Sequence, residues 1–105
     1  ATALGSTAYS MAAGGPACHP EVRMLELTPL APHRPRFPSL VLPANAVIQV
    51  EALDTHKRPV RAVSDGRDQS ALSSVTIQDA GSDIRLASFE GRHPTAVLIR
   101  KLLSS

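Results

Sequence analysis

The sequence predicts an all-β fold, a β-sandwich, with a short helix near each end of the chain. Short runs of alternating apolar and polar residues fill the region from residue 40 onward, and turn-forming residues separate them about every eight to twelve positions. Two runs of helical composition lie near the ends, one rich in Ala and Met and the other in Leu and Ile. Because the chain has 105 residues, 43% of them hydrophobic, we expect a single domain over residues 1–105.

The first helix is expected directly after the start of the chain. Residues 1–4 should be the end of a strand, and Ser6 or Thr7 can cap the Ala- and Met-rich helix that follows. Gly14-Gly15, followed by Pro16, supplies the left-handed residue and the breaker that end it. We therefore expect a short helix enclosed by two turns.

Alternation and turn signals place the strands. They are expected at residues 24–28, 40–42, 46–52, 59–63, 74–78 and 83–89, with a loop or short strand at 68–72. The clearest is 46–52, where Ala and aliphatic residues fall on one face and Gln49 and Glu51 on the other. Polar residues 54–58 form a hairpin connection to strand 59–63, and turns follow at 64–67 and 79–82. Prolines make residues 32–38 an irregular connection.

The second helix is expected to begin at Pro94 and to run through residue 102. Apolar residues four apart can pack down on the sheet; the pairs are Leu98 with Leu102 and Ile99 with Leu103. Arg100 and Lys101 favour the negative end of the helix dipole.

Composition excludes several classes of function. Aromatic residues make up 3% of the chain and Trp is absent, which argues against a base-stacking nucleic-acid platform and predicts an aliphatic core. The formal net charge is +2, and the densest basic run, residues 33–36, is short and broken by proline. The single cysteine, Cys18, cannot form an internal disulfide, and we find neither a secretory signal nor a membrane-spanning run. We therefore expect a cytoplasmic protein without nucleic-acid or membrane partners. From the abrupt start without Met we expect a fragment, or the ordered part, of a longer chain.

Catalytic and metal motifs are weak. The four histidines are scattered, and Cys18-His19 are adjacent instead of spaced as zinc ligands, so we predict no metal site. Gly-x-Ser-x-Gly does not occur, and no histidine is marked as the base of a nucleophilic serine. The phosphate-binding Walker pattern is also absent, so this chain shows no triphosphate site of its own.

Two stretches remain candidates for binding, each with a plain structural alternative. Residues 5–16 offer hydroxyls and free backbone N–H groups to a polar or anionic ligand, but they equally describe a capped helix of small residues. Asp65, before Gly66, could face a ligand, yet at an Asp-Gly turn it more simply bonds to its own backbone. The residues alone favour the structural interpretation in both cases.

An ordered series of motifs resembles one family. Residues 5–10 (Gly-Ser-Thr-Ala-Tyr-Ser), 13–16 (Ala-Gly-Gly-Pro) and 19–20 (His-Pro) are similar to the NAD-binding signature in the carboxyl-terminal domain of NAD kinases. The similarity continues, in the family's order, through residues 27–33 (Leu-Thr-Pro-Leu-Ala-Pro-His), 40–44 (Leu-Val-Leu-Pro-Ala), 64–67 (Ser-Asp-Gly-Arg) and 98–102 (Leu-Ile-Arg-Lys-Leu).

The resemblance implies a substrate and a set of binding residues. NAD kinases use ATP, or in some members polyphosphate, to phosphorylate the 2′-hydroxyl of the adenosine ribose of NAD, with a divalent metal that is usually magnesium. Thr7, Ala8 and Tyr9 would line the dinucleotide pocket; Ala12, where the family often has a serine, would lie beside it. Asp65 would approach the nicotinamide riboside end. The family forms dimers and tetramers, so a homodimer or homotetramer is expected.

The resemblance also implies that part of the enzyme is missing. The family joins an amino-terminal α/β domain to a carboxyl-terminal β-sandwich, and its Gly-Gly-Asp-Gly motif, which carries the proton acceptor, does not occur here. We therefore expect no catalytic residue in this chain and no activity without the other domain. Leu4, Ala12 and residues 17–18 depart from the family pattern. A non-catalytic β-sandwich interaction or ligand-binding module is the alternative; lipid and diacylglycerol kinases share the two-domain plan but lack this Gly-Ser-Thr-Ala-Tyr run.

Overall fold

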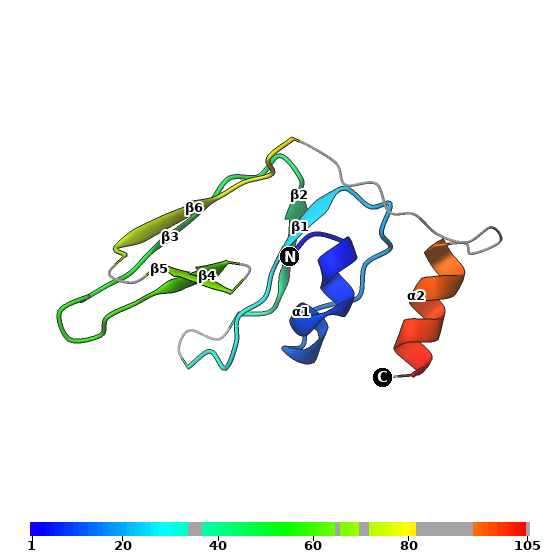
Figure 1. Ribbon diagram of the computed structural model, residues 1–105, viewed down its shortest axis with the longest axis horizontal. Helices are drawn as coiled ribbons and strands as arrows, with labels where there is room; N and C mark the ends of the chain where they lie inside the picture. The colour runs from blue at the N-terminus through cyan, green and yellow to red at the C-terminus, as the bar shows by residue number, and fades with distance from the viewer. Residues whose placement is uncertain (34–36, 65, 70–71, 82–93, 105) are drawn as a thin grey trace. The chain divides into compact units, whose positions relative to one another are not determined.

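The computed structural model describes residues 1–33, 37–64, 66–69, 72–81 and 94–104 (Figure 1). These residues belong to two compact units, one comprising residues 1–46 and 81–105 and the other residues 47–80. Each unit is described by itself.

The first unit contains the helices and one sheet. Its elements are the 3₁₀-helix η1 (Leu4–Thr7), the one-turn helix α1 (Tyr9–Ala12), the strands β1 (Met24–Leu27) and β2 (Leu40–Pro43), and the helix α2 (Pro94–Leu103). β1 and β2 are antiparallel, with Leu25 opposite Leu42 and Glu26 opposite Val41. Both strands confirm the sequence prediction, because each is a short apolar run bounded by proline or turn residues.

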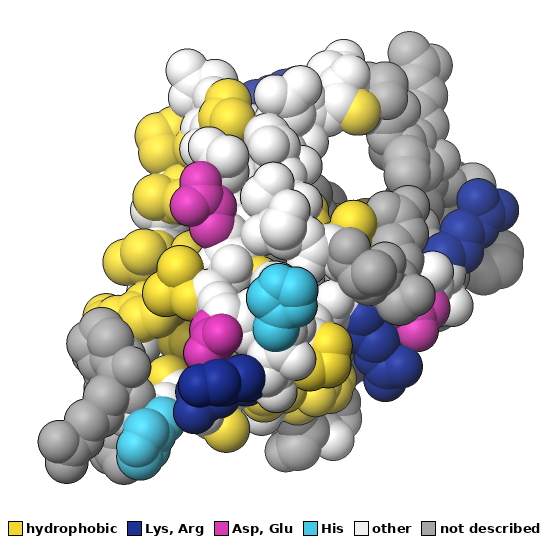
Figure 2. Space-filling view, turned by 90° about the vertical axis from the view of Figure 1, so that its left-hand side faces the viewer, with side chains coloured by type: hydrophobic (Ala, Val, Ile, Leu, Met, Phe, Trp, Pro, Cys, Tyr) yellow, Lys and Arg dark blue, Asp and Glu magenta, His cyan; other side chains and the backbone are white. Residues whose placement is uncertain are grey.

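The core of this unit lies where the start of the chain meets β1. Thr2 forms an isolated antiparallel bridge with Leu25, but Leu4 already belongs to η1, so the strand end predicted over residues 1–4 is reduced to this single bridge. Ala3, Met24 and Leu25 are the buried hydrophobic residues among those described. Large aliphatic side chains elsewhere are often exposed, and Figure 2 shows such uncovered hydrophobic side chains on one face of the molecule. The described core is therefore aliphatic, as predicted, but small.

The second unit consists of two antiparallel strand pairs. β3 (Ile48–Glu51) pairs with β6 (Ser74–Ile77), and β4 (Ala62–Ser64) pairs with β5 (Arg67–Gln69). The predicted hairpin from strand 46–52 to strand 59–63 is wrong, because β3 pairs with β6. In that pairing Val50 lies opposite Val75 and Ile48 opposite Ile77, so aliphatic side chains face each other across the ladder.

The β4–β5 hairpin is local. Gly66 adopts φ 75°, the positive value that the predicted Asp-Gly turn requires, and an exposed ion pair joins Arg61 to Asp68 at 3.1 Å. In the described residues the strands form three two-stranded antiparallel sheets, with short helices near the ends of the chain. The sandwich itself stays a prediction, and the expected strand 83–89 lies outside the described residues.

The helices differ from expectation in their contacts. α1 begins after Ala8, and no side chain caps it, so the predicted cap by Ser6 or Thr7 is wrong; both residues belong to η1. The predicted stop is confirmed, since Gly14 has φ 95°.

α2 confirms the predicted second helix, with Arg100 and Lys101 in its last turn. Within the described residues its main contact is with η1 rather than with a sheet, and Ile99 is 51% exposed. Two hydrogen bonds hold it there, one between His19 Nε2 and Thr95 Oγ1 (2.8 Å) and one from Lys101 Nζ to Thr7 Oγ1 (3.3 Å).

Truncating the core side chain of β1 should destabilise the fold strongly. Leu25 is 7% exposed, so Leu25→Ala is expected to lower the free energy of unfolding by about 2–4 kcal/mol. Leu53→Ala is the matched control, because Leu53 is 83% exposed and its truncation should change stability by less than about 0.5 kcal/mol. Denaturant unfolding measures both, and equal losses in the two variants would contradict the placement of the core.

Candidate functional site

Four of the five predicted binding residues lie together on η1, on α1 and at the junction between them. Thr7 ends η1 and is half-buried, Ala8 joins the two helices, and Tyr9 and Ala12 are the ends of α1. Ala8, Tyr9 and Ala12 are exposed, and the Tyr9 side chain is 71% accessible. The fifth residue, Asp65, lies outside the described residues. The local chain thus presents an aromatic ring, a hydroxyl and short side chains on one continuous surface segment.

Ser6, in the same segment, is directed inward. It is fully buried (0% exposed), and its Oγ donates to the carbonyl oxygen of Ala3 at 2.7 Å. Ser6 Oγ also accepts a hydrogen bond from the backbone N–H of Cys18 at 2.8 Å. Ser6 therefore ties η1 to the loop that follows α1.

Ser10, four residues later, is also directed inward and meets a buried carboxylate. Glu26 on β1 is 3% exposed, and its Oε1 accepts hydrogen bonds from Ser10 Oγ at 2.5 Å and from Thr28 Oγ1 at 3.0 Å. Thr28 Oγ1 also shares a hydrogen bond of 2.6 Å with Ser39 Oγ, which either hydroxyl could donate, and Ser39 Oγ lies 3.3 Å from the Leu27 carbonyl oxygen. We call these four residues, Ser10, Glu26, Thr28 and Ser39, the carboxylate–hydroxyl cluster.

Gly15 closes over this cluster. A Cβ atom added to Gly15 would overlap Glu26 Oε1 and would lie 2.6 Å from Ser10 Oγ and 2.7 Å from Thr28 Oγ1. Glycine is therefore required here by close approach of the backbone, whereas the neighbouring Gly14 is required by its positive φ.

The cluster also sets the chemistry of Cys18. Burial raises the pKa of the Cys18 thiol, and the nearby Glu26 carboxylate raises it further by its charge and by a contact of 3.7 Å from Sγ to Oε2; a hydrogen bond with Ser6 acts in the opposite direction. Cys18 is thus a structural thiol beside the segment and is poorly suited to be a nucleophile.

Sequence reasoning missed Glu26, Thr28 and Ser39 as parts of this arrangement. One signal for Glu26 was present, because it is the single charged residue in the strand Met24–Leu27 and shares a strand face with Met24 and Thr28. A carboxylate on an inward face needs hydrogen-bond donors, and three hydroxyl residues were available nearby.

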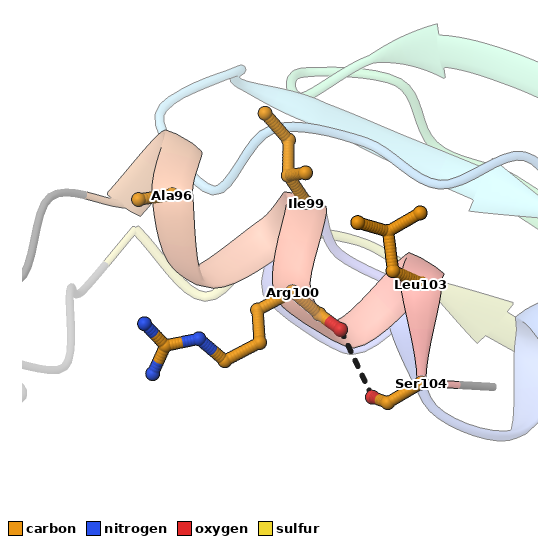
Figure 3. Close-up of a pocket in the computed structure, with 5 residues that line it drawn as sticks. All are labelled: Ala96, Ile99, Arg100, Leu103 and Ser104. Carbon is orange, nitrogen blue, oxygen red and sulfur yellow. Dashed lines mark hydrogen bonds between the residues drawn. The ribbon is translucent and has the colours of Figure 1, made fainter.

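Other site types are not supported by the described residues. Within them, no group of three or more His, Cys, Asp or Glu side chains could hold a metal ion, and no helix combines the length and apolar character needed to cross a membrane. Figure 3 shows an open hollow along α2, lined by Ala96, Ile99, Arg100, Leu103 and Ser104. Its lining comes from one helix and its end and contains one charged side chain, so it lacks the convergent polar groups of a ligand site.

Comparison with known proteins identifies a matching family model and several similar proteins. The family model of the ATP-NAD kinase C-terminal domain matches residues 1–81. The NAD kinase of Brucella suis biovar 1 (strain 1330) is 38% identical over 94 residues, which cover 89% of this chain and 37% of the relative. The NAD kinase of Rickettsia bellii (strain OSU 85-389) is 46% identical over 79 residues, covering 74% of this chain and 31% of the relative.

Filling the space at Gly15 should disrupt the cluster. Gly15→Ala is expected to destabilise the protein by about 1–3 kcal/mol, because its methyl group enters the space of the Glu26 carboxylate. Gly5→Ala serves as the control, since a Cβ there would meet nothing closer than 3.8 Å. Thermal unfolding compares the two; a Gly15→Ala variant as stable as Gly5→Ala would show that the approach is not close.

Alkylation should report the environment of Cys18. A raised pKa leaves less thiolate at any given pH, so Cys18 should react with iodoacetamide more slowly than free cysteine, and its rate should rise at higher pH. Glu26→Gln removes the carboxylate charge, so it should lower the pKa of Cys18 and shift the rise in alkylation rate to lower pH. Mass spectrometry of the Cys18 peptide follows the reaction, and a profile like that of free cysteine would refute the assigned environment.

Proposed function

We propose, because this chain belongs to the ATP-NAD kinase C-terminal domain family, that it is the NAD-binding part of an NAD kinase. The chain spans about a third of the length of the curated relatives it matches, 37% of one and 31% of another. The activity therefore belongs to the whole protein: transfer of a phosphoryl group from ATP or polyphosphate to the 2′-hydroxyl of the adenosine ribose of NAD, which yields NADP.

One observation carries this proposal. Residues 5–10 direct Ser6 and Ser10 inward, while Tyr9 is 71% exposed beside the half-buried Thr7 and the exposed Ala8. The segment is fixed by the inward hydrogen bonds of Ser6 and Ser10, so its exposed ring can stack against a nucleotide. The Thr7 hydroxyl and backbone groups can hydrogen-bond to the same ligand. Such an arrangement supplies position and orientation, which phosphoryl transfer needs more than covalent participation.

The proposal also includes the fold of this domain, the second domain of the enzyme, its oligomeric state and its metal. Residues 1–105 belong to one β-sandwich domain, and Asp65 approaches the nicotinamide riboside end of NAD. An amino-terminal α/β domain supplies the proton acceptor, and the enzyme works in the cytoplasm as a homodimer or homotetramer. Magnesium or another divalent metal neutralises the transferred phosphate, and we assign it no ligand among the described residues.

Removing the ring of Tyr9 should weaken NAD binding without unfolding the protein. Tyr9→Ala in the whole protein is expected to raise the Kd for NAD about tenfold, since loss of one base-stacking ring costs about 1–3 kcal/mol. Its melting temperature should change little, because the ring is exposed. Tyr9→Phe keeps the ring and is the control. An unchanged Kd in Tyr9→Ala by calorimetry would refute the assignment of the segment.

The chain should bind substrate but not turn it over alone. With ATP, magnesium and NAD, the whole protein is expected to form NADP and residues 1–105 alone none, because Gly-Gly-Asp-Gly does not occur here. A coupled assay for NADP decides. Turnover by the purified 105 residues would overturn the division of labour, and no NADP from the whole protein would overturn the function.

A further inference from the structure

The buried carboxylate of Glu26 has a structural position that the proposed function does not yet use. A carboxylate with 3% exposure is costly unless hydrogen-bond donors compensate its lost hydration. Here two hydroxyls donate to the same oxygen, and in the described residues no buried side-chain nitrogen or oxygen lacks a partner. The charge is therefore accommodated by donors that come from α1 and from the end of β1.

The helical turn α1, which Glu26 contacts, is too short to be stable by itself. α1 is a single turn, Tyr9–Ala12, and a helix of that length is unstable without tertiary contacts. Its closing hydrogen bonds run from Ala13 N–H to the Tyr9 carbonyl (3.0 Å) and from Gly15 N–H to the Ser10 carbonyl (2.8 Å). Glu26 contacts this turn at Ser10 by a hydrogen bond and would be overlapped by any side chain at Gly15. Glu26 thus bonds to the turn at Ser10 and lies close to the backbone at Gly15, three residues after the turn ends.

We propose that Glu26 is a positioning residue for NAD, which through Ser10 fixes the orientation of α1 and thereby of the Tyr9 ring. This inference rests on the proposed function. Ser10 follows Tyr9 directly, about 100° further around the same turn, so a rotation that breaks the Ser10–Glu26 bond also moves the Tyr9 ring. A binding residue must be held to within about 0.5 Å of its productive position. Loosening the turn therefore lowers the affinity for NAD even though Glu26 itself does not contact the ligand.

Single substitutions can separate what the Glu26 carboxylate and the Ser10 hydroxyl each contribute to NAD affinity. Glu26→Gln keeps a carbonyl oxygen that can accept from Ser10 and Thr28, whereas Glu26→Ala removes both acceptors. Ser10→Ala leaves the carboxylate in place and cuts its bond to α1. Glu51→Ala is the matched control, because Glu51 is an exposed carboxylate on β3.

The test uses the whole protein and follows NAD binding by calorimetry, steady-state kinetics and thermal unfolding. Glu26→Ala and Ser10→Ala are each expected to raise the KM and Kd for NAD about tenfold, with the KM for ATP and the kcat at saturating NAD within about twofold of wild type. Glu26→Gln should recover most of the affinity, and Glu51→Ala should match wild type. The double variant Ser10→Ala/Glu26→Ala should lose no more affinity than either single variant, because both remove one interaction.

The outcomes separate this inference from the proposed function. A folded Glu26→Ala or Ser10→Ala protein with wild-type NAD affinity overturns the inference, as do losses that add fully in the double variant. If Glu26→Ala does not fold, Ser10→Ala alone and combined with Glu26→Gln decides by the same criterion. If wild type binds no NAD, or Tyr9→Ala binds it normally, the proposed function fails and the inference with it; if Tyr9→Ala is impaired while Ser10→Ala is not, only the inference fails.

Discussion

The hydrogen bonds that Glu26 accepts from Ser10 and Thr28 are the constraint on which the rest of this site depends. They join β1, whose residues Met24 and Leu25 form the small described core together with Ala3, to a helical turn too short to persist alone. A buried carboxylate is demanding, because it must be surrounded by donors in defined places. That demand gives the turn one orientation, which an aliphatic contact of the same size would fix less strictly.

The Gly-Ser-Thr-Ala-Tyr-Ser segment therefore combines inward-facing serines, four positions apart, with an exposed stretch between them. Ser6 and Ser10 face the interior and bind the segment to Ala3, Cys18 and Glu26. Tyr9 faces solvent, with Thr7 at the edge of the surface. The hydroxyl groups that first suggest a polar ligand site are thus partly structural. The solvent-facing part of the segment is smaller, and under the proposed function it contributes orientation without chemistry of its own.

Local patterns in the sequence predicted the local structure well. Strands β1, β2 and β6, the positive φ of Gly14 and Gly66 and the second helix follow from apolar runs and turn residues. The pairing of the strands was less predictable. β3 pairs with β6, although β4 and β5 lie between them in the sequence, and no local sequence signal indicates this non-local partner. The cap at Ser6 failed because a 3₁₀ turn placed this residue inside the protein. Glu26 was visible as an isolated charge in an apolar strand, but only the fold shows its donors. Asp65 stays a prediction from resemblance.

Amide hydrogen exchange is the most direct test of the claim that one carboxylate holds the turn. In wild type, the amides of Ala13 and Gly15, which close α1, should be protected, and Ser10→Ala should abolish that protection while the β1–β2 ladder keeps its own. Unchanged protection of these two amides would contradict the claim, as would an equal loss across β1 and β2.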